Sequence, residues 1–82
     1  MQKYTENDYD ARTFAEIWGK LTPAEQSELR FQLTRNGDCS RVSVYKWAEK
    51  GVRPVSLGMR KRVSSIVNKT LGIKTTHLTL FP

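Results

Sequence analysis

The sequence predicts an all-α fold, a bundle of four to five short helices followed by a short extended tail at the C-terminus. Apolar residues recur at helical spacing in four segments, and capping residues stand at the ends of these segments. The length of 82 residues, with 38% apolar residues, suits one domain with a single modest core. We expect this domain to consist of an arm (1–7), a helical core (8–72) and a tail (73–82).

The first helix is expected from about Asp8 to Trp18. Acidic residues occupy its first turn, where they interact favourably with the helix dipole, and Gly19 follows its end. Its apolar positions recur at helical spacing and are Ala11, Phe14, Ile17 and Trp18.

The second helix has the strongest local signal in the chain, the segment T-P-A-E. Thr22 can cap the helix, Pro23 suits the first helical position, and Glu25 can complete a capping box. We expect this helix to continue to about Arg35, where the following Asn-Gly pair allows a left-handed C-cap.

The third helix is expected from Arg41 to about Lys50, with Ser40 as its N-cap and Gly51 and Pro54 after its end. At about 100° per residue, one side of this helix is apolar and consists of Val44, Trp47 and Ala48. The opposite side carries Val42, Tyr45, Lys46 and Glu49, and Arg41 and Lys50 flank it. A basic and partly aromatic outer face is unusual for a helix that is only solvated.

The fourth helix should span about Leu57 to Leu71, with Gly72 as its stop signal. Its apolar stripe consists of Met59, Val63, Ile66, Val67 and Leu71. The tail after it has the alternation of a strand, with Leu78 and Leu80 on one side. A lone strand is not stable, so it must pair, pack on the helices or stay loose. Pairing with the same tail of a second copy predicts a two-fold homodimer.

Charge is distributed unevenly along the chain. From Met1 to Glu28, three basic residues stand against six acidic ones, which gives −3. From Leu29 to Pro82, eleven basic residues stand against two acidic ones, which gives +9, and the two parts sum to the net charge of +6. A basic half of this kind is typical of a protein that binds a polyanion, most often nucleic acid.

Several function classes find no support in the sequence. The single cysteine, Cys39, cannot form an internal disulfide or a zinc site, so we expect it to be a small buried residue. No nucleophile has a base nearby, and no phosphate loop or metal spacing occurs, so we expect no enzyme activity, cofactor or metal; no small-molecule ligand is evident either. No apolar run approaches the roughly 18 residues of a membrane span, and the N-terminus has no signal-peptide pattern, so we expect a cytoplasmic protein without a membrane partner.

The two central helices, separated by N-G-D-C, form a helix-turn-helix pattern. At this point the chain resembles the Cro/repressor-like helix-turn-helix family, also called the xenobiotic-response-element type. That family carries S-x-x-T-[IV]-x-x-W…G…P over its recognition helix and the loop after it. The match here consists of Ser40, Ser43 in place of threonine, Val44, Trp47, Gly51 one position late, and Pro54. The turn before the recognition helix is also longer than the family's usual one.

The resemblance implies that one face of the third helix reads base edges, and the helical wheel selects the same residues: Arg41, Val42, Tyr45 and Lys46. Val44 and Trp47 would hold the helix against the core. A second set of residues is expected to contact DNA phosphates and consists of Ser43, Lys50, Arg53, Arg60, Lys61 and Arg62. Tyr45 has an alternative role as a half-buried ring that covers the helix edge.

These observations predict a sequence-specific double-stranded DNA-binding protein, a small transcriptional regulator that represses by occupying an operator as a homodimer. Two alternatives stay open, an RNA-binding module and a protein-interaction adaptor of the antitoxin or anti-regulator type. An RNA reader would more typically expose several stacking aromatic residues, whereas Tyr45 is the one candidate here. An adaptor would not need Arg41 and Lys46 on an otherwise clean outer face.

Overall fold

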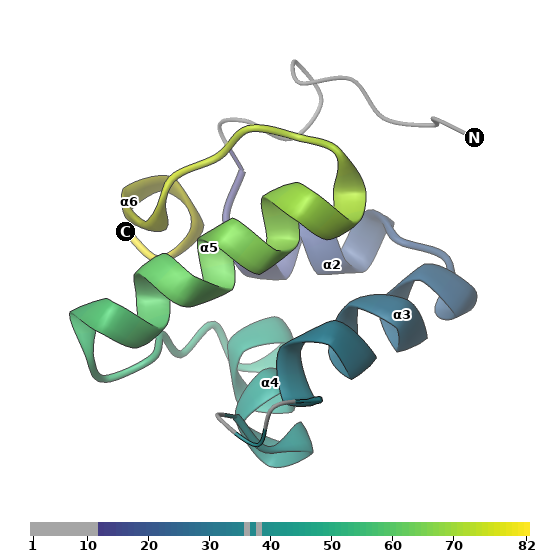
Figure 1. Cartoon of the computed structure of the whole chain (residues 1–82), viewed down its shortest axis with the longest axis horizontal. Coiled ribbons are helices and arrows are strands. Elements are labelled where there is room, and N and C mark those ends of the chain that lie inside the picture. The colour runs from purple at the N-terminus through teal and green to yellow at the C-terminus, as the bar shows by residue number, and fades with distance from the viewer. Residues whose placement is uncertain (1–11, 36, 38) are drawn as a thin grey trace.

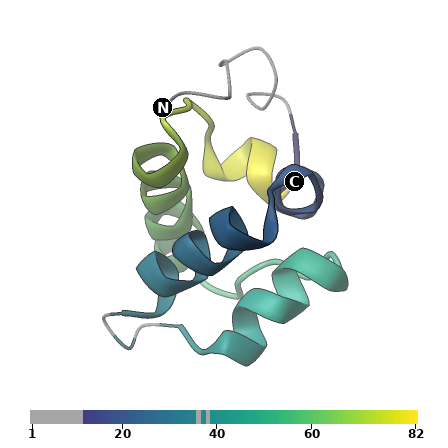
Figure 2. The ribbon, with the colours of Figure 1, turned by 90° about the vertical axis from the view of Figure 1, so that its right-hand side faces the viewer.

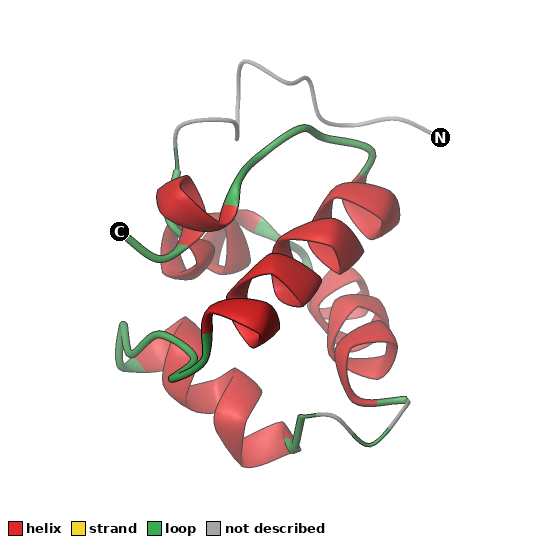
Figure 3. Cartoon of the chain, turned by 60° about the vertical axis from the view of Figure 1, so that its left-hand side comes forward, coloured by secondary structure: helices red, strands yellow, loops and turns green. Residues whose placement is uncertain are grey.

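The computed structural model describes residues 12–35, 37 and 39–82. In these residues the chain forms helices only, as Figures 1 and 3 show, and the predicted all-α class is confirmed. None of the described helices has the length and apolar character needed to cross a membrane. In chain order the helices are α2 (Phe14–Lys20), α3 (Pro23–Thr34), α4 (Arg41–Glu49), α5 (Leu57–Leu71) and α6 (His77–Leu80).

Helix α2 begins at Phe14, later than the predicted start at Asp8. The side chain of Thr13 accepts a hydrogen bond from the backbone N–H of Glu16 (3.2 Å), and the Glu16 carboxylate accepts one from the Thr13 N–H (2.9 Å). This capping box satisfies free amides of the first turn and sets the start of the helix. Arg12 therefore lies before the helix, which corrects the prediction there. The rest of the predicted start, 8–11, and the predicted arm, 1–7, lie outside the described residues.

Helix α3 begins as the segment T-P-A-E predicted. Thr22 and Glu25 form the expected capping box, with N–H···O distances of 2.8 and 3.2 Å, and Pro23 occupies the first helical position. The helix ends at Thr34, and Arg35 is its C-cap. Gly37, in the turn that follows, has a φ of +78°, a left-handed conformation that glycine adopts without a steric penalty.

Helices α4 and α5 also agree with the predicted bounds. Ser40 caps α4 by accepting a hydrogen bond from the Ser43 N–H (3.1 Å), and the helix ends one residue before Lys50. Ser56 caps α5 in the same way, and α5 ends at the left-handed Gly72 (φ +69°). Both helices are therefore delimited by contacts within about one turn of their ends.

The core is built around Phe14, a fully buried residue of α2. Its ring stacks on Trp18 (5.9 Å between centroids) and on Phe81 (5.6 Å), and it meets Trp47 edge to face (6.1 Å). The rings of Trp47 and Phe81 are in turn 6.0 Å apart. Aromatic pairs in this range contribute about 0.5–1.5 kcal/mol beyond the area that they bury. This cluster joins α2, α4 and the C-terminal segment, while α3 packs on α5.

Residues His77–Leu80 form the short helix α6, so the strand predicted for the tail is wrong. Thr76 caps the short helix α6, in which Leu80 is buried and Leu78 is exposed, and Phe81 after it is buried too. The two leucines therefore do not form one face, and the segment 73–82 contributes Ile73, Leu80 and Phe81 to the core. The Asn68 side chain holds the approach to α6 by donating to the Thr75 carbonyl (3.0 Å) and accepting from the Thr75 N–H (2.9 Å).

Candidate nucleic-acid interface

Helix α4 is held against the core by one of its sides. Val44, Trp47 and Ala48 are all buried, and α4 contacts both α2 and α3. Figure 2 shows α3 and α4, which follow one another in the chain, as neighbours, the arrangement of a helix-turn-helix. The apolar side predicted for this helix is therefore confirmed, and the opposite side is free to meet a partner.

The opposite side of α4 is exposed, as the helical wheel predicted. Val42 is 61% exposed and Tyr45 is 54% exposed, and the charged side chains of Arg41 and Lys46 also lie at the surface. With just over half of its surface in solvent, Tyr45 both covers the helix edge and offers a ring to a partner. Val42 and Tyr45 thus form an exposed apolar strip that does not pack against the core.

The structure divides the predicted base-reading residues between two hollows, one on each flank of α4. Arg41, Val42 and Tyr45 line a groove between α4 and α3. Lys46 instead lines a hollow of about 400 Å³ on the other flank, together with Ser43 and residues of the loop that follows α4. Lys46 is therefore placed with the predicted phosphate contacts Ser43 and Arg53 rather than with Tyr45.

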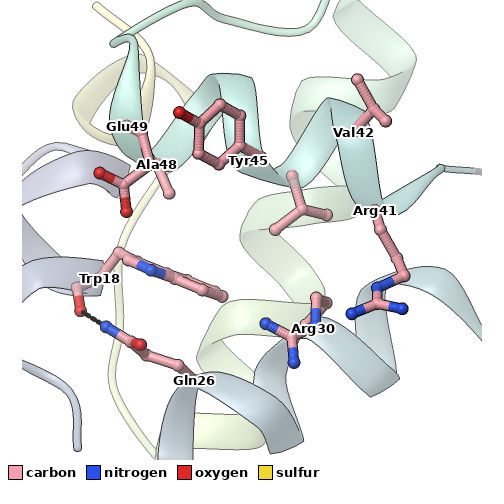
Figure 4. Close-up of a pocket in the computed structure, with 9 residues that line it drawn as sticks. Trp18, Gln26, Arg30, Arg41, Val42, Tyr45, Ala48 and Glu49 are labelled. Atoms are coloured by element: carbon pink, nitrogen blue, oxygen red, sulfur yellow. Dashed lines mark hydrogen bonds between the residues drawn. The ribbon is translucent and has the colours of Figure 1, made fainter. Parts of the chain in front are cut away.

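The groove between α3 and α4, which we call the seam groove, has a volume of about 380 Å³ (Figure 4). The Trp18 indole of α2 forms its floor, and the Gln26 side chain donates a hydrogen bond to the Trp18 carbonyl (2.9 Å). Arg30 of α3 enters the groove opposite Arg41 of α4. Sequence reasoning missed Arg30, although its position four residues after Gln26 places both on one face of α3.

The six predicted phosphate contacts have different surroundings. Lys50 and Lys61 extend into solvent, and Arg62 is exposed on α5. Arg53 lies in the loop after α4, where its guanidinium donates to the Pro82 carbonyl at 3.4 Å. Ser43 is half-buried, and its hydroxyl accepts a hydrogen bond from the Ser40 hydroxyl (3.2 Å).

The Arg60 guanidinium is held by two backbone carbonyls of the preceding loop. Nε donates to the Pro54 carbonyl and Nη2 donates to the Val55 carbonyl, each at 2.9 Å. The side chain thus fastens the loop between α4 and α5 to the first turn of α5. Its first role is structural, and a phosphate contact would use the donors that remain.

Cys39 lies at the end of the turn before α4. Its thiol donates to the Leu33 carbonyl (3.1 Å) and lies 3.8 Å from the Met59 sulfur, and the half-buried side chain packs against the core. Cys39 thereby links the end of α3 to α5, close to the small buried role expected for it. Within the described part of the chain, no three His, Cys, Asp or Glu side chains gather where they could hold a metal ion.

The described surface therefore contains a helix-turn-helix whose second helix is locked on one side and exposed on the other. The two hollows on its flanks are lined by Arg30 and Arg41 on one side and by Lys46 and Arg53 on the other, and further exposed cations lie on α5. Comparison of the chain with known protein families, curated protein sequences and solved structures found no match.

Proposed function

We propose that the protein binds double-stranded DNA sequence-specifically, as a helix-turn-helix protein of the Cro/repressor-like type. The observation that carries this proposal is the division of α4 into a buried side and an exposed basic side. Because Val44 and Trp47 anchor α4 to the core, the outer side chains of the helix keep a fixed position relative to the rest of the domain. Such a helix fits the major groove, where base edges carry a donor and acceptor pattern that is unique to each base pair.

Each outer residue has a chemical counterpart in the groove. Arg41, in the first turn of α4, can donate two hydrogen bonds to guanine O6 and N7. Val42 can pack on a thymine methyl group, and Tyr45 can contact a base or the sugar edge beside it. On the other flank, Lys46 has a reach that suits a guanine or a phosphate.

The surrounding cations support the backbone contacts of this complex. Lys50, Arg53, Lys61 and Arg62 lie at the surface on the loop side of α4 and on α5. Phosphate contacts fix the orientation of a protein on the duplex but carry no sequence information, so these residues would position α4. The simplest biological role is a small cytoplasmic transcriptional regulator that represses by occupying an operator as a homodimer.

The proposal is tested by selecting bound sequences from a random duplex library and then measuring variants on the selected site. Arg41→Ala should lose about 1–3 kcal/mol on that site and much less on random DNA, because a base contact discriminates between sequences. Lys61→Ala is the matched control, since loss of a phosphate contact should weaken binding to both duplexes about equally.

Two results would contradict the proposal. A library that yields no enriched motif would remove the sequence-specific function. Tighter binding of single-stranded RNA than of any duplex at the same salt concentration would instead favour an RNA-binding module. Equal losses on selected and random DNA for Arg41→Ala would reduce this residue to a backbone contact.

A further inference from the structure

The seam groove has apolar walls and a wide aromatic floor. The Trp18 indole lies at its base, and the side chains of Val44, Ala48 and Tyr45 line its α4 side. Its volume of about 380 Å³ lies at the lower end of the range for small-molecule sites, about 300–1,000 Å³. The groove therefore has room for a ligand with one ring, which would lie against Trp18.

The polar groups of the groove are separated by charge. The guanidinium groups of Arg30 and Arg41 lie at one end and the Glu49 carboxylate lies toward the other, as Figure 4 shows. To the described residues, the two guanidinium groups make only one hydrogen bond, from Arg30 to the Ser27 hydroxyl at 3.3 Å. Two cations that face one groove without a carboxylate partner favour an anion at that end.

The floor supplies one more donor. The indole Nε1–H of Trp18 has no hydrogen-bond acceptor among the described residues, and the atom is not fully buried. A polar hydrogen in a largely apolar groove stays hydrated until a ligand replaces its water. The Nε1–H group of Trp18 also gives an NMR signal that changes when a ligand occupies the groove.

We propose that the seam groove binds a small aromatic carboxylate, with its ring on Trp18 and its carboxylate at Arg30 and Arg41. Glu49 fixes the orientation, because it repels a carboxylate from the opposite end of the groove. A neutral apolar ligand would leave both guanidinium groups without a partner, and an inorganic anion would leave the apolar walls uncovered. The combination of ring and negative charge matches both features.

Binding at this site would oppose DNA binding, a consequence that rests on the proposed function. Arg41, Val42 and Tyr45 line the groove and are also the residues proposed to face base edges. A carboxylate on Arg41 would occupy the donors that guanine needs. The aromatic carboxylate would thus act as an effector that releases the operator, and DNA would reciprocally weaken the binding of the ligand.

The binding step can be tested with phenylacetate, its neutral analogue phenylacetamide, and acetate. In a two-dimensional ¹H–¹⁵N spectrum of the whole chain, the two tryptophan Nε1–H signals can be assigned with Trp18→Phe. We expect phenylacetate to shift the Trp18 signal with half-saturation in the millimolar range. Phenylacetamide and acetate should bind several-fold more weakly, because each lacks one of the two matching features. No Trp18 shift, or equal shifts for the acid and the amide, would overturn the proposal.

Variants separate a specific contact from a general effect of charge. Arg30→Gln and Arg41→Gln should each weaken phenylacetate binding about three- to tenfold, because each removes a charge-assisted hydrogen bond. Arg35→Gln removes the same charge from the end of α3 but does not line the groove, so it should leave binding unchanged. An equal loss in Arg35→Gln would show that phenylacetate responds only to net charge and would overturn the site.

The effect on DNA is measured separately, at equal concentrations of phenylacetate and acetate so that ionic strength is matched. Phenylacetate should lower the affinity for the selected duplex in the native chain and much less in Arg30→Gln. If phenylacetate shifts Trp18 without changing duplex affinity, the regulatory role is wrong although the site exists. If the protein binds no duplex while the Trp18 shift persists, the proposed function fails and the ligand site stands.

Discussion

At the scale of single residues, three consecutive cations show how neighbours in sequence acquire different roles. Arg60, Lys61 and Arg62 have the same charge and adjacent positions, and charge alone predicts that all three contact phosphate. The Arg60 guanidinium, however, donates to two carbonyls of the loop that precedes α5, whereas Lys61 is exposed. The role of a cation here depends on which backbone carbonyls lie within its reach.

This difference predicts unequal effects on stability. Arg60→Gln should lower the free energy of unfolding by about 1 kcal/mol, because it removes two charge-assisted hydrogen bonds that hold the loop. Lys61→Gln should change the free energy of unfolding by less than about 0.5 kcal/mol, as is usual for an exposed residue. Urea denaturation followed by tryptophan fluorescence measures both values. Equal stabilities of the two variants would show that the Arg60 contacts do not persist in solution.

At the scale of helices, the locally capped ends of α3, α4 and α5 agree with the prediction, whereas the start of α2 and the C-terminal segment do not. Thr22, Ser40 and Gly72 stand where their residue types predicted. The C-terminal segment alternates like a strand, yet it forms α6 and places Leu80 and Phe81 in the core. Burial of Phe81 against the rings of Phe14 and Trp47 outweighs a strand preference of a few tenths of a kcal/mol per residue.

The packing of α6 predicts that the chain does not tolerate truncation. Deletion of residues 77–82 removes a buried leucine and a buried phenylalanine, and comparable losses cost about 2–5 kcal/mol each in protein cores. A small domain has roughly 5–15 kcal/mol of stability in total, so the truncated chain should lose its cooperative thermal transition. Circular dichroism during heating measures this. Leu78→Ala is the control, since Leu78 is 71% exposed and its loss should have little effect.

The strand interpretation of the tail implies the opposite result: deletion of residues 75–82 would leave the helical core folded and would lower operator affinity. A truncated protein that melts cooperatively near the temperature of the intact chain would support that interpretation. It would also show that Phe81 adds little to the aromatic cluster.

At the scale of the whole molecule, the asymmetry of charge supports a polyanion partner. The chain has a net charge of +6. The segment from Leu29 onward, which includes α4 and α5, has a net charge of +9. A homodimer would double the number of base contacts and would require a palindromic operator with half-sites about one helical turn apart. Leu80 is buried in the core, so the predicted pairing of Leu78 and Leu80 with the same tail of a second copy is not available to join such a dimer.

The same asymmetry predicts a strong dependence of DNA binding on salt. If one copy neutralises about four to six phosphates, log K should fall with log salt concentration with a slope of roughly −4 to −5. Lys61→Gln should reduce the magnitude of this slope by about one. Fluorescence anisotropy of a labelled duplex between low and physiological salt measures the slope. A complex that is insensitive to salt would contradict the proposed phosphate contacts.

The sequence by itself determined the helical class, the bounds of α3, α4 and α5, and the division of α4 into inner and outer sides. These features depend on interactions within one or two helical turns. A threonine three residues before a glutamate forms a capping box wherever the rest of the chain goes. The side chains at 44, 47 and 48 share one side of a helix because 3.6 residues make one turn.

Only the tertiary structure decided the fate of the C-terminal segment, the role of Arg60 and the existence of the seam groove. The C-terminal segment and the groove join residues that are far apart in the sequence, and Arg60 binds carbonyls of the loop five and six residues before it. Phe81 meets Phe14 across most of the chain, and the groove combines Trp18 of α2, Arg30 of α3 and Arg41 of α4. Periodicity and capping describe a helix alone, whereas burial depends on which surfaces the fold brings together, and no local pattern records that choice.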